Sequence, residues 1–391
     1  MDFTAEASAI HDKLVALRRE LHAHPETDTD TAWTADRIAA ELDAIDVPYT
    51  RLADNQVVGR IGSGANPSIA LRADMDGLPI TEDTGLHFAS TNGAMHACGH
   101  DGHMAMLVGA ARLLKKIQDE QTGTIHLCFQ SAEETGQGWG RILDHLADSG
   151  GVDQAIALHL WADVDIGTVS VVSGPRMAGV ERFDITITGR GGHGSRPDLA
   201  IDPIKPAAAT VLAISAIPSN MANPLEPAVV HVGKLDAGTT FNVFPSTATI
   251  EGQFRYFTSG TRRAAKSKIE QIAKGTAQAY GANADVVFSS PMPPVVNDPT
   301  SVRQAEQIIE DMPSLTNVEF EQIAASENFS QYLEVYPGFM AYLGIKSPES
   351  EQFYHHHPKF DINEDVLTYG AEFLARYAHQ HLVGKAAMQE P

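Results

Sequence analysis

The sequence contains little cysteine, few basic residues and no long apolar run. Only two of its 391 residues are cysteines, Cys98 and Cys128, so a disulfide framework is excluded. The 28 basic residues are outnumbered by 50 acidic ones, which gives a formal net charge of -22. Nucleic acids and anionic membranes are bound through basic faces, so we expect neither as a partner. No apolar stretch approaches the length of a membrane span.

Residues 1–4 do not begin a basic segment followed by an apolar one, so we recognise no secretory signal. We therefore expect a cytoplasmic protein, in which reducing conditions keep Cys98 available as a thiolate. Hydrophobic residues make up 43% and charged residues 20% of the chain, which is typical of a globular protein. A chain of this length exceeds one ordinary core and predicts two domains.

The densest group of ligand-type side chains lies in residues 95–103, which contain one cysteine, three histidines and one aspartate. Thiolate and imidazole groups favour zinc or another divalent transition metal. The alternative is a chance cluster in a chain with 17 histidines. Further ligand-type residues occur later in the chain, at the ends of predicted strands, and they argue against a chance cluster.

The first part of the chain alternates apolar strands with amphipathic helices. Strands are expected at 68–72, 124–129 and 155–160, and a helix starts just after the Cys/His loop. This alternation predicts an α/β domain with a mostly parallel sheet. Sites in such sheets lie at the carboxyl ends of strands. Residues with suitable side chains fall at those ends: Asp76, Glu133, Glu134 and His159.

The pattern changes after residues 173–175. Strands and helices then follow in the order β-α-β-β-α-β, which is the ferredoxin-like arrangement, and the proline-rich stretch 291–294 ends it. We predict a discontinuous catalytic domain of residues 1–178 and 291–391. A smaller domain of residues 179–290 is inserted into it.

Two adjacent carboxylates, Glu133 and Glu134, end the strand 124–129. If one binds a metal, the other can take a proton from water whose pKa the metal lowers. A solvated acidic turn is the alternative. Asp74 and Asp76 are candidates to orient a metal ligand, or they simply belong to the turn before Gly77.

Three residues of the inserted domain are further candidates. The glycine-rich stretch 189–194 lacks the ending of a phosphate-binding loop, so we expect it to hold His193 out on a flexible backbone. Asn242 and Arg255 flank the third strand, and arginine suits a substrate carboxylate. An ordinary surface arginine is the alternative. His103, His126 and Cys128 are interpreted as structural.

Six motifs together resemble the amidohydrolase branch of the aminoacylase and glutamate carboxypeptidase metallopeptidases. They are HACGHD (96–101), FQSAEE (129–134), ALH (157–159), GGH (191–193), GTTFNVFP (238–245) and HHPKF (356–360). The resemblance extends from about residue 17 to residue 374. One departure is Asn328, where the family usually has aspartate.

The resemblance implies two divalent metal ions per subunit, zinc, manganese, cobalt or nickel, with ligands Cys98, His100, Glu134, His159 and His356. Within the run of three histidines, the spacing to Pro358 favours His356 over its neighbours. The resemblance also implies that Glu133 is the general base and that Asn242 lies near the substrate. It further implies that His193 reaches the active site of a neighbouring subunit. The smaller domain would then be a lid that forms a homodimer or a higher oligomer.

We therefore expect a metal-dependent amidohydrolase that cleaves N-acyl amino acids. A dipeptidase or carboxypeptidase of the same family is the nearest alternative. A non-catalytic metal-binding protein that retains the fold is the alternative from another class. Loss of Glu133 or a ligand would favour the last, and the sequence retains all of them.

Overall fold

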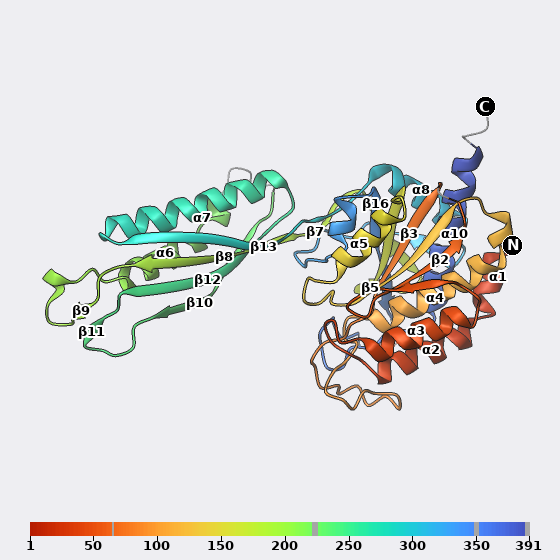
Figure 1. Ribbon diagram of the computed structural model, residues 1–391, viewed down its shortest axis with the longest axis horizontal. Helices are drawn as coiled ribbons and strands as arrows, with labels where there is room; N and C mark the ends of the chain where they lie inside the picture. The colour runs from red at the N-terminus through yellow and green to blue at the C-terminus, as the bar shows by residue number, and fades with distance from the viewer. Residues whose placement is uncertain (65, 221–225, 348–351, 388–391) are drawn as a thin grey trace. The chain divides into compact units, whose positions relative to one another are not determined.

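The computed structural model describes residues 1–64, 66–220, 226–347 and 352–387 (Figure 1). The chain forms two compact units. Unit 1 comprises Met1–Gly174, Val296–Glu321 and Asn328–Pro391, and unit 2 comprises Pro175–Val295 and Gln322–Glu327. The sequence prediction had placed residues 175–178, 291–295 and 322–327 in the larger domain, whereas they belong to the smaller unit. Among the described residues, no helix combines the length and the apolar character needed to cross a membrane.

Unit 1 is built on an eight-stranded sheet in the order β1-β2-β4-β3-β5-β16-β6-β15. Neighbours among β4, β3, β5 and β16 run parallel, while β1 and β2 add an antiparallel edge. The strands are β1 (Tyr49–Arg51), β2 (Val57–Gly62), β3 (Ser68–Asp74), β4 (Thr124–Gln130), β5 (Gln154–Asp165), β6 (Thr168–Ser170), β15 (Thr316–Asn317) and β16 (Gly338–Lys346). The predicted mostly parallel α/β sheet is therefore confirmed.

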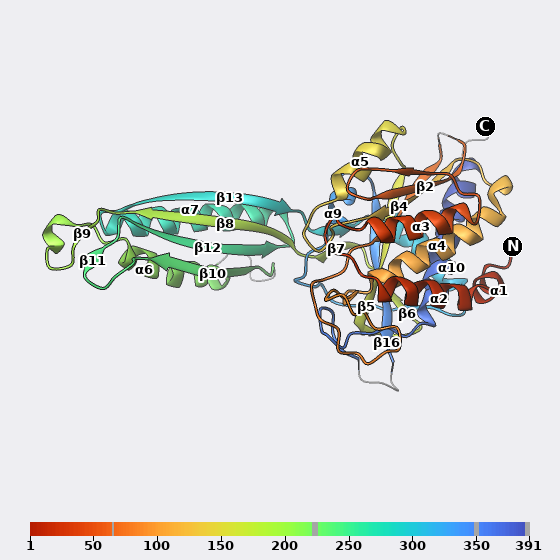
Figure 2. The ribbon, with the colours of Figure 1, turned by 60° about the horizontal axis from the view of Figure 1, so that its bottom comes forward.

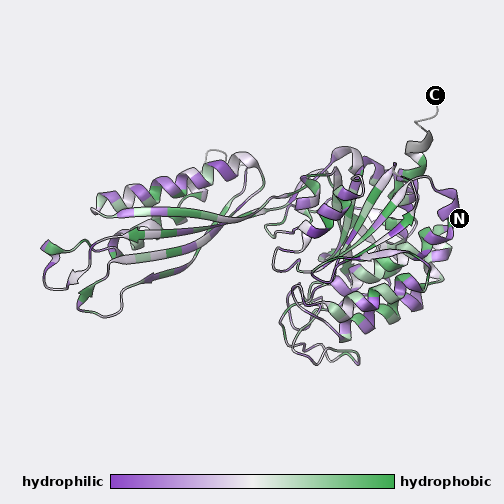
Figure 3. Cartoon of the chain, viewed as in Figure 1, coloured by the Kyte–Doolittle hydropathy of each residue, from purple (hydrophilic) through white to green (hydrophobic). Residues whose placement is uncertain are grey.

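Helices of unit 1 pack around this sheet, as the two ribbon views show (Figures 1 and 2). Helix α4 contacts α2, α10 and β3, and α5 contacts β4. The apolar side chains of the sheet and of these helices form the main core, in which β3 and β4 are buried along their whole length. Hydrophobic residues are frequent along the central strands (Figure 3). The helices are α1 (Phe3–Ser8), α2 (His11–Ala23), α3 (Ala32–Asp43), α4 (His100–Lys116), α5 (Trp139–Asp148), α8 (Pro299–Glu310), α9 (Ser330–Leu333), α10 (Val366–Ala387) and the 3-10 turn η1 (Gln118–Glu120).

Unit 2 contains a four-stranded antiparallel sheet in the order β10-β12-β8-β13. Its elements are β8 (Gly179–Thr188), β9 (Gly192–His193), η2 (Pro197–Leu199), α6 (Ile204–Ser215), η3 (Pro218–Asn220), β10 (Val229–Ala237), β11 (Val243–Phe244), β12 (Thr247–Tyr256), α7 (Ser259–Ala279) and β13 (Asn283–Met292). The long elements follow the predicted β-α-β-β-α-β order. Strands β7 (Gly174–Met177) and β14 (Val295–Asn297) lie where the chain leaves one unit for the other.

Two boundaries differ from the sequence predictions. Helix α4 begins at His100, inside the expected Cys/His loop, because Gly99 takes a left-handed φ of 85° at the N-cap and lets the chain turn directly into the helix. Strand β5 continues to Asp165, five residues past the expected end, so His159 lies near the middle of the strand instead of near its end. The first difference moves a predicted ligand, His100, from a loop onto a helix.

A buried network of charges joins the segments that lead into the Cys/His motif. Arg18 donates to Asp101 at 2.8 Å and to Asp361 at 2.7 Å, and all three belong to different segments of the chain. The ring nitrogens of His22 lie 2.8 Å from Asp101 and 3.1 Å from Glu82. Burial alone would lower the pKa of His22, but the hydrogen bonds to Asp101 and Glu82 outweigh it and raise that pKa to about 9.

This network predicts that stability falls in mildly alkaline solution. The pKa of His22 lies above its unfolded value of 6.5, so its stabilising contribution is complete below that pH and is lost as the pH rises to about 9. The contribution is on the order of 3 kcal/mol. Urea midpoints measured from pH 6 to 9.5 should fall more steeply for the wild type than for His22→Gln. The exposed His24 of the same region serves as a control, and His24→Gln should keep the wild-type slope. Equal slopes for His22→Gln and the wild type would contradict the assignment.

Candidate metal centre and active site

The predicted ligands converge in unit 1. Two groups of ligand atoms, each within 4.8 Å of one another, share the same thiol: Cys98, His100 and His159 form one, and Cys98, Glu134 and His356 form the other. The carboxylates of Glu133 and Glu134 form a third such group with His100. The structure thus brings together all five ligands that the resemblance implied, with Glu133 beside them. Two overlapping ligand sets suit a pair of divalent ions, and we propose that these residues hold them.

His100 is oriented as a metal ligand would be. Its Nδ1 donates to the backbone carbonyl of Asp76 at 2.7 Å, which leaves the lone pair on Nε2. That Nε2 is buried and makes no hydrogen bond to any described residue. Burial alone would lower the pKa of His100, but the carboxylates of Asp74 and Glu134 outweigh it and raise that pKa. A buried ring nitrogen that makes no hydrogen bond and lies close to carboxylates is suited to bind a cation.

His159 is held in the same way from β5. Its Nδ1 lies 2.7 Å from the carbonyl oxygen of Leu160, and its Nε2 lies 3.7 Å from Cys98 Sγ. Burial and the neighbouring His103 lower the pKa of His159 well below its usual range, so the imidazole stays neutral. Metal ligation requires a neutral imidazole.

His103 lies in a further group of possible ligands with Asp74 and His100, but both of its ring nitrogens make hydrogen bonds. Its Nε2 accepts a hydrogen bond from the Leu160 N–H at 2.9 Å, so the proton sits on Nδ1 and is donated to Asp74 at 2.6 Å. Burial would raise the pKa of Asp74, but Arg72, His100 and His103 hold it well below its usual range. The carboxylate of Asp74 therefore stays charged beneath the ligand cluster.

The three consecutive histidines have different surroundings. His355 lies with its Nε2 2.9 Å from the carbonyl oxygen of Leu160, and His357 stacks on Phe353 with ring centroids 4.6 Å apart. Only His356 among the three is in a ligand group, with Nε2 3.3 Å from Glu134 Oε1. Its backbone N–H donates to the carbonyl of Ala97 at 2.8 Å, which ties this segment to the Cys98 turn. The geometry favours His356, in agreement with the spacing argument.

Asp76 fixes the turn that contains Glu133 and Glu134. The Asp76 carboxylate accepts the backbone N–H groups of Glu133 at 2.9 Å and Glu134 at 3.1 Å. Ala132 precedes them with a φ of 60°, in the left-handed region that non-glycine residues seldom adopt. Such strain persists only where the surroundings enforce it, and it is typical of functional sites. Burial raises the pKa of Asp76 to about 6, against the lowering effect of His100 and of those N–H groups.

His193 and Asn242 lie together in unit 2, at the end of its sheet where β9 pairs with β11 (Figure 2). The Gly194 N–H donates to the Asn242 carbonyl at 2.8 Å, and both His193 and Asn242 are exposed. The expectation of a flexible glycine loop is wrong in one respect, because His193 belongs to a short strand. A Cβ on Gly194 would lie 2.9 Å from the Asn242 carbonyl oxygen, so this glycine permits close approach of two backbones.

Arg255 lies at the other end of β12. Arg255 pairs with Val180 of β8 and with Val229 of β10. The opposite end of β12, at Thr247, is the end that follows β11. The Nη1 of Arg255 donates to the carbonyl of Ala324 at 2.6 Å. The structure therefore does not group Arg255 with His193 and Asn242 within one chain. A backbone carbonyl already occupies one donor of its guanidinium.

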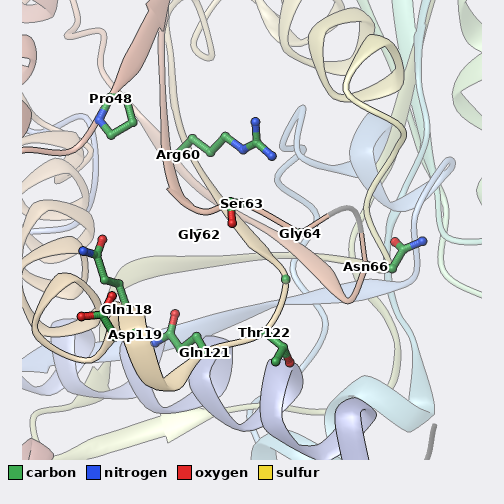
Figure 4. Close-up of a pocket in the computed structure, with 11 residues that line it drawn as sticks. Pro48, Arg60, Gly62, Ser63, Gly64, Asn66, Gln118, Asp119, Gln121 and Thr122 are labelled. Carbon is green, nitrogen blue, oxygen red and sulfur yellow. The ribbon is translucent and has the colours of Figure 1, made fainter.

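A pocket elsewhere in unit 1 contains none of the predicted ligands. It is lined by Arg60, Ser63, Asn66, Gln118 and neighbouring residues at the end of β2 and the start of β4 (Figure 4). Glu133 follows the opposite end of β4, which is seven residues long and therefore about 20 Å away along the strand. This pocket is therefore separate from the candidate metal centre.

Sequence reasoning missed two contacts within the site. It did not predict that the Asp76 backbone carbonyl orients His100, because backbone contacts leave no residue-type signal. It noted Asn328 only as a departure from the family pattern. In the structure, the Asn328 N–H donates to Glu133 Oε1 at 3.1 Å.

Comparison with known proteins decides the family. The profile of peptidase family M20/M25/M40 matches residues 70–380. The chain belongs to this family. Its relatives include an N-acetylcysteine deacetylase of Bacillus subtilis, 36% identical over 377 residues, covering 95% of this chain and 97% of the relative. An N-acyl-L-amino acid amidohydrolase of Geobacillus stearothermophilus is 40% identical over 287 residues, covering 73% of this chain and 78% of the relative.

This M20-family protein is also similar to a solved structure of the family. The YXEP protein of Bacillus subtilis, described as a dinuclear metal-binding peptidase of the M20 family, has a TM-score of 0.84. It is 34% identical, and the match covers 96% of this chain and 99% of that one. Together, the family and the ligand groups support a metal-binding hydrolase fold.

Proposed function

We propose that this M20-family protein hydrolyses the amide bond of N-acyl amino acids and releases a carboxylic acid and a free amino acid. The observation that carries the proposal is the position of Glu133, which is 9% exposed and lies beside two ligand groups joined by Cys98. A carboxylate there would lie next to cations held by the five proposed ligands without being one of those ligands. The names of the two relatives above support an N-acyl amino acid as the substrate class.

The residues of the site have distinct roles in this reaction. A pair of divalent ions held by the five ligands would polarise the scissile carbonyl and acidify a water molecule. Glu133 takes the proton of the attacking water on its carboxylate and gives it to the leaving amine. Asp76 holds the backbone of Glu133 and Glu134, so both carboxylates keep their direction through the reaction. The identity of the metal is open among zinc, manganese, cobalt and nickel, because this mixed N, O and S ligand set suits all four.

We further propose that unit 2 acts as a lid in a homodimer. The β9–β11 ribbon presents exposed side chains around His193 and Asn242, and Phe241, next to Asn242 in the chain, is 99% exposed. A partner that covered this aromatic side chain would remove apolar surface from water. A second copy of this chain is the proposed partner, with His193 entering its active site to steady the oxyanion. We assign Asn242 to the substrate carboxylate. Arg255 lies at the other end of β12, so in the same role it would have to come from the other chain of the dimer.

Activity on a panel of substrates with and without chelator tests the function. N-acetyl and other N-acyl amino acids should be hydrolysed, dipeptides should react more slowly, and chelation should abolish turnover until a divalent ion is added back. Metal content should be one or two ions per subunit. Faster turnover of dipeptides would instead favour a peptidase of the same family. Full activity in a metal-free sample would exclude the proposed chemistry.

A further inference from the structure

Asn328 lies directly against the proposed general base. Asn328 is completely buried, and its backbone N–H donates to Glu133 Oε1 at 3.1 Å. A shift of the Asn328 backbone would therefore move or release one carboxylate oxygen of Glu133. The contacts that fix the position of Asn328 therefore influence the position of the Glu133 carboxylate.

The side chain of Asn328 is anchored by three hydrogen bonds. Its Oδ1 accepts from Arg72 Nη2 at 3.0 Å and from Gln130 Nε2 at 2.9 Å. Its Nδ2 donates to the backbone carbonyl of Gln137 at 2.8 Å. Every partner is in unit 1, and Arg72 and Gln130 are themselves buried.

The direction of the amide follows from its neighbours. Gln130 Oε1 accepts from Tyr332 at 2.9 Å and from Arg72 Nε at 3.3 Å, so Gln130 must donate through Nε2. Asn328 therefore receives that hydrogen on its oxygen, and its amide nitrogen faces the Gln137 carbonyl, which can only accept. An ionised aspartate would place a second oxygen 2.8 Å from that carbonyl without a proton between them.

Gln137 closes the turn that contains both glutamates. Its N–H donates to the carbonyl of the strained Ala132 at 2.8 Å. The Asn328 side chain thus holds the far end of the turn, while its backbone holds the Glu133 carboxylate within the turn. One residue restrains the general base from two directions.

We propose that Asn328 is a positioning residue for Glu133, and that its amide donor to Gln137 is the part that an aspartate could not supply in this network. The inference rests on the proposed function, because it requires Glu133 to be the proton acceptor. Its effect belongs to the chemical step. Substrate binding and metal binding do not depend on it.

Replacing the side chain tests this role. Asn328→Ala should lower kcat by about 10–100-fold, as expected for a misplaced catalytic group, while KM changes by less than about threefold. Metal content should equal that of the wild type, because the hydrogen bonds of the altered side chain go to Arg72, Gln130 and Gln137 and not to the five ligands. Asn328→Asp preserves the shape and both acceptors but loses the donor, and it should lower kcat by about tenfold or more. Wild-type kcat in Asn328→Asp would overturn the role of the donor.

Asn297 provides a matched control in the same unit. It is 1% exposed, donates to the carbonyls of Val172 and Met340, and accepts the Met340 N–H; neither partner belongs to the proposed site. Asn297→Ala should lower the melting temperature as Asn328→Ala does, yet keep kcat within about twofold of the wild type. Equal losses of kcat in the two variants would show general destabilisation and overturn the proposal. If Glu133→Ala is inactive and Asn328→Ala has normal kcat, this inference alone fails; if Glu133→Ala is fully active, the proposed function fails.

Discussion

Glu133→Ala is expected to lower kcat by about 10²–10⁴-fold, the usual contribution of a general base. The metal content of this variant should stay near that of the wild type, because the five other side chains still provide both ligand groups. Elemental analysis of the purified variant and steady-state kinetics measure the two quantities separately. Loss of activity with retained metal would distinguish a proton-transfer role from a ligand role.

Glu134→Ala is the matched comparison, since it removes the adjacent carboxylate of the same turn. Glu134 belongs to the group with Cys98 and His356, and its pKa is lowered, despite burial, by His356 and His100. This variant should lose metal together with activity. If Glu133→Ala lost metal and Glu134→Ala kept it, the two assignments would be reversed.

Mixed dimers should recover activity from two inactive parents. Glu133→Ala and His193→Ala homodimers should each be nearly inactive if each active site combines Glu133 of one chain with His193 of the other. Unfolding the two together and refolding them should give mixed dimers in half of the population, each with one intact site. About a quarter of the wild-type activity should therefore return.

The composition of the refolded sample can be checked by native mass spectrometry. Absence of recovery in a sample that contains mixed dimers would assign His193 to its own chain or remove it from catalysis. A control mixture of Glu133→Ala with Glu134→Ala should remain inactive if each mixed site still depends on a complete Glu133–Glu134 pair from one chain. The exposed position of His193 on β9 makes its substitution compatible with folding.

Local patterns in the sequence were sufficient for much of the fold. Alternation of apolar side chains at 124–129 predicted β4, and helical spacing after the Cys/His motif predicted α4. The structure contains both elements, although it buries β4 along its whole length and most of α4. The placement of Glu133 and Glu134 at the carboxyl end of β4 followed from the same reasoning. The βαββαβ order of unit 2 was also predictable from its strands and helices.

Boundaries and backbone conformations were less predictable. The start of α4 at His100 depends on the left-handed Gly99, and the extension of β5 to Asp165 depends on pairing with β16. The glycines around His193 were expected to give flexibility, whereas Gly194 lets two backbones approach. Composition identifies a glycine-rich segment, but it does not tell which neighbour each glycine meets.

Residue types and the resemblance of their motifs to a known family thus indicated which side chains are candidate metal ligands, and the strand pattern placed Glu133 and Glu134 after the carboxyl end of β4. Folding alone established the partners that orient them: the Asp76 carbonyl on His100, and the different surroundings of His355, His356 and His357. The contact between Arg72 and Asn328 joins residues 256 positions apart. Such a hydrogen bond constrains two distant segments through geometry, so it leaves no periodic pattern in either of them.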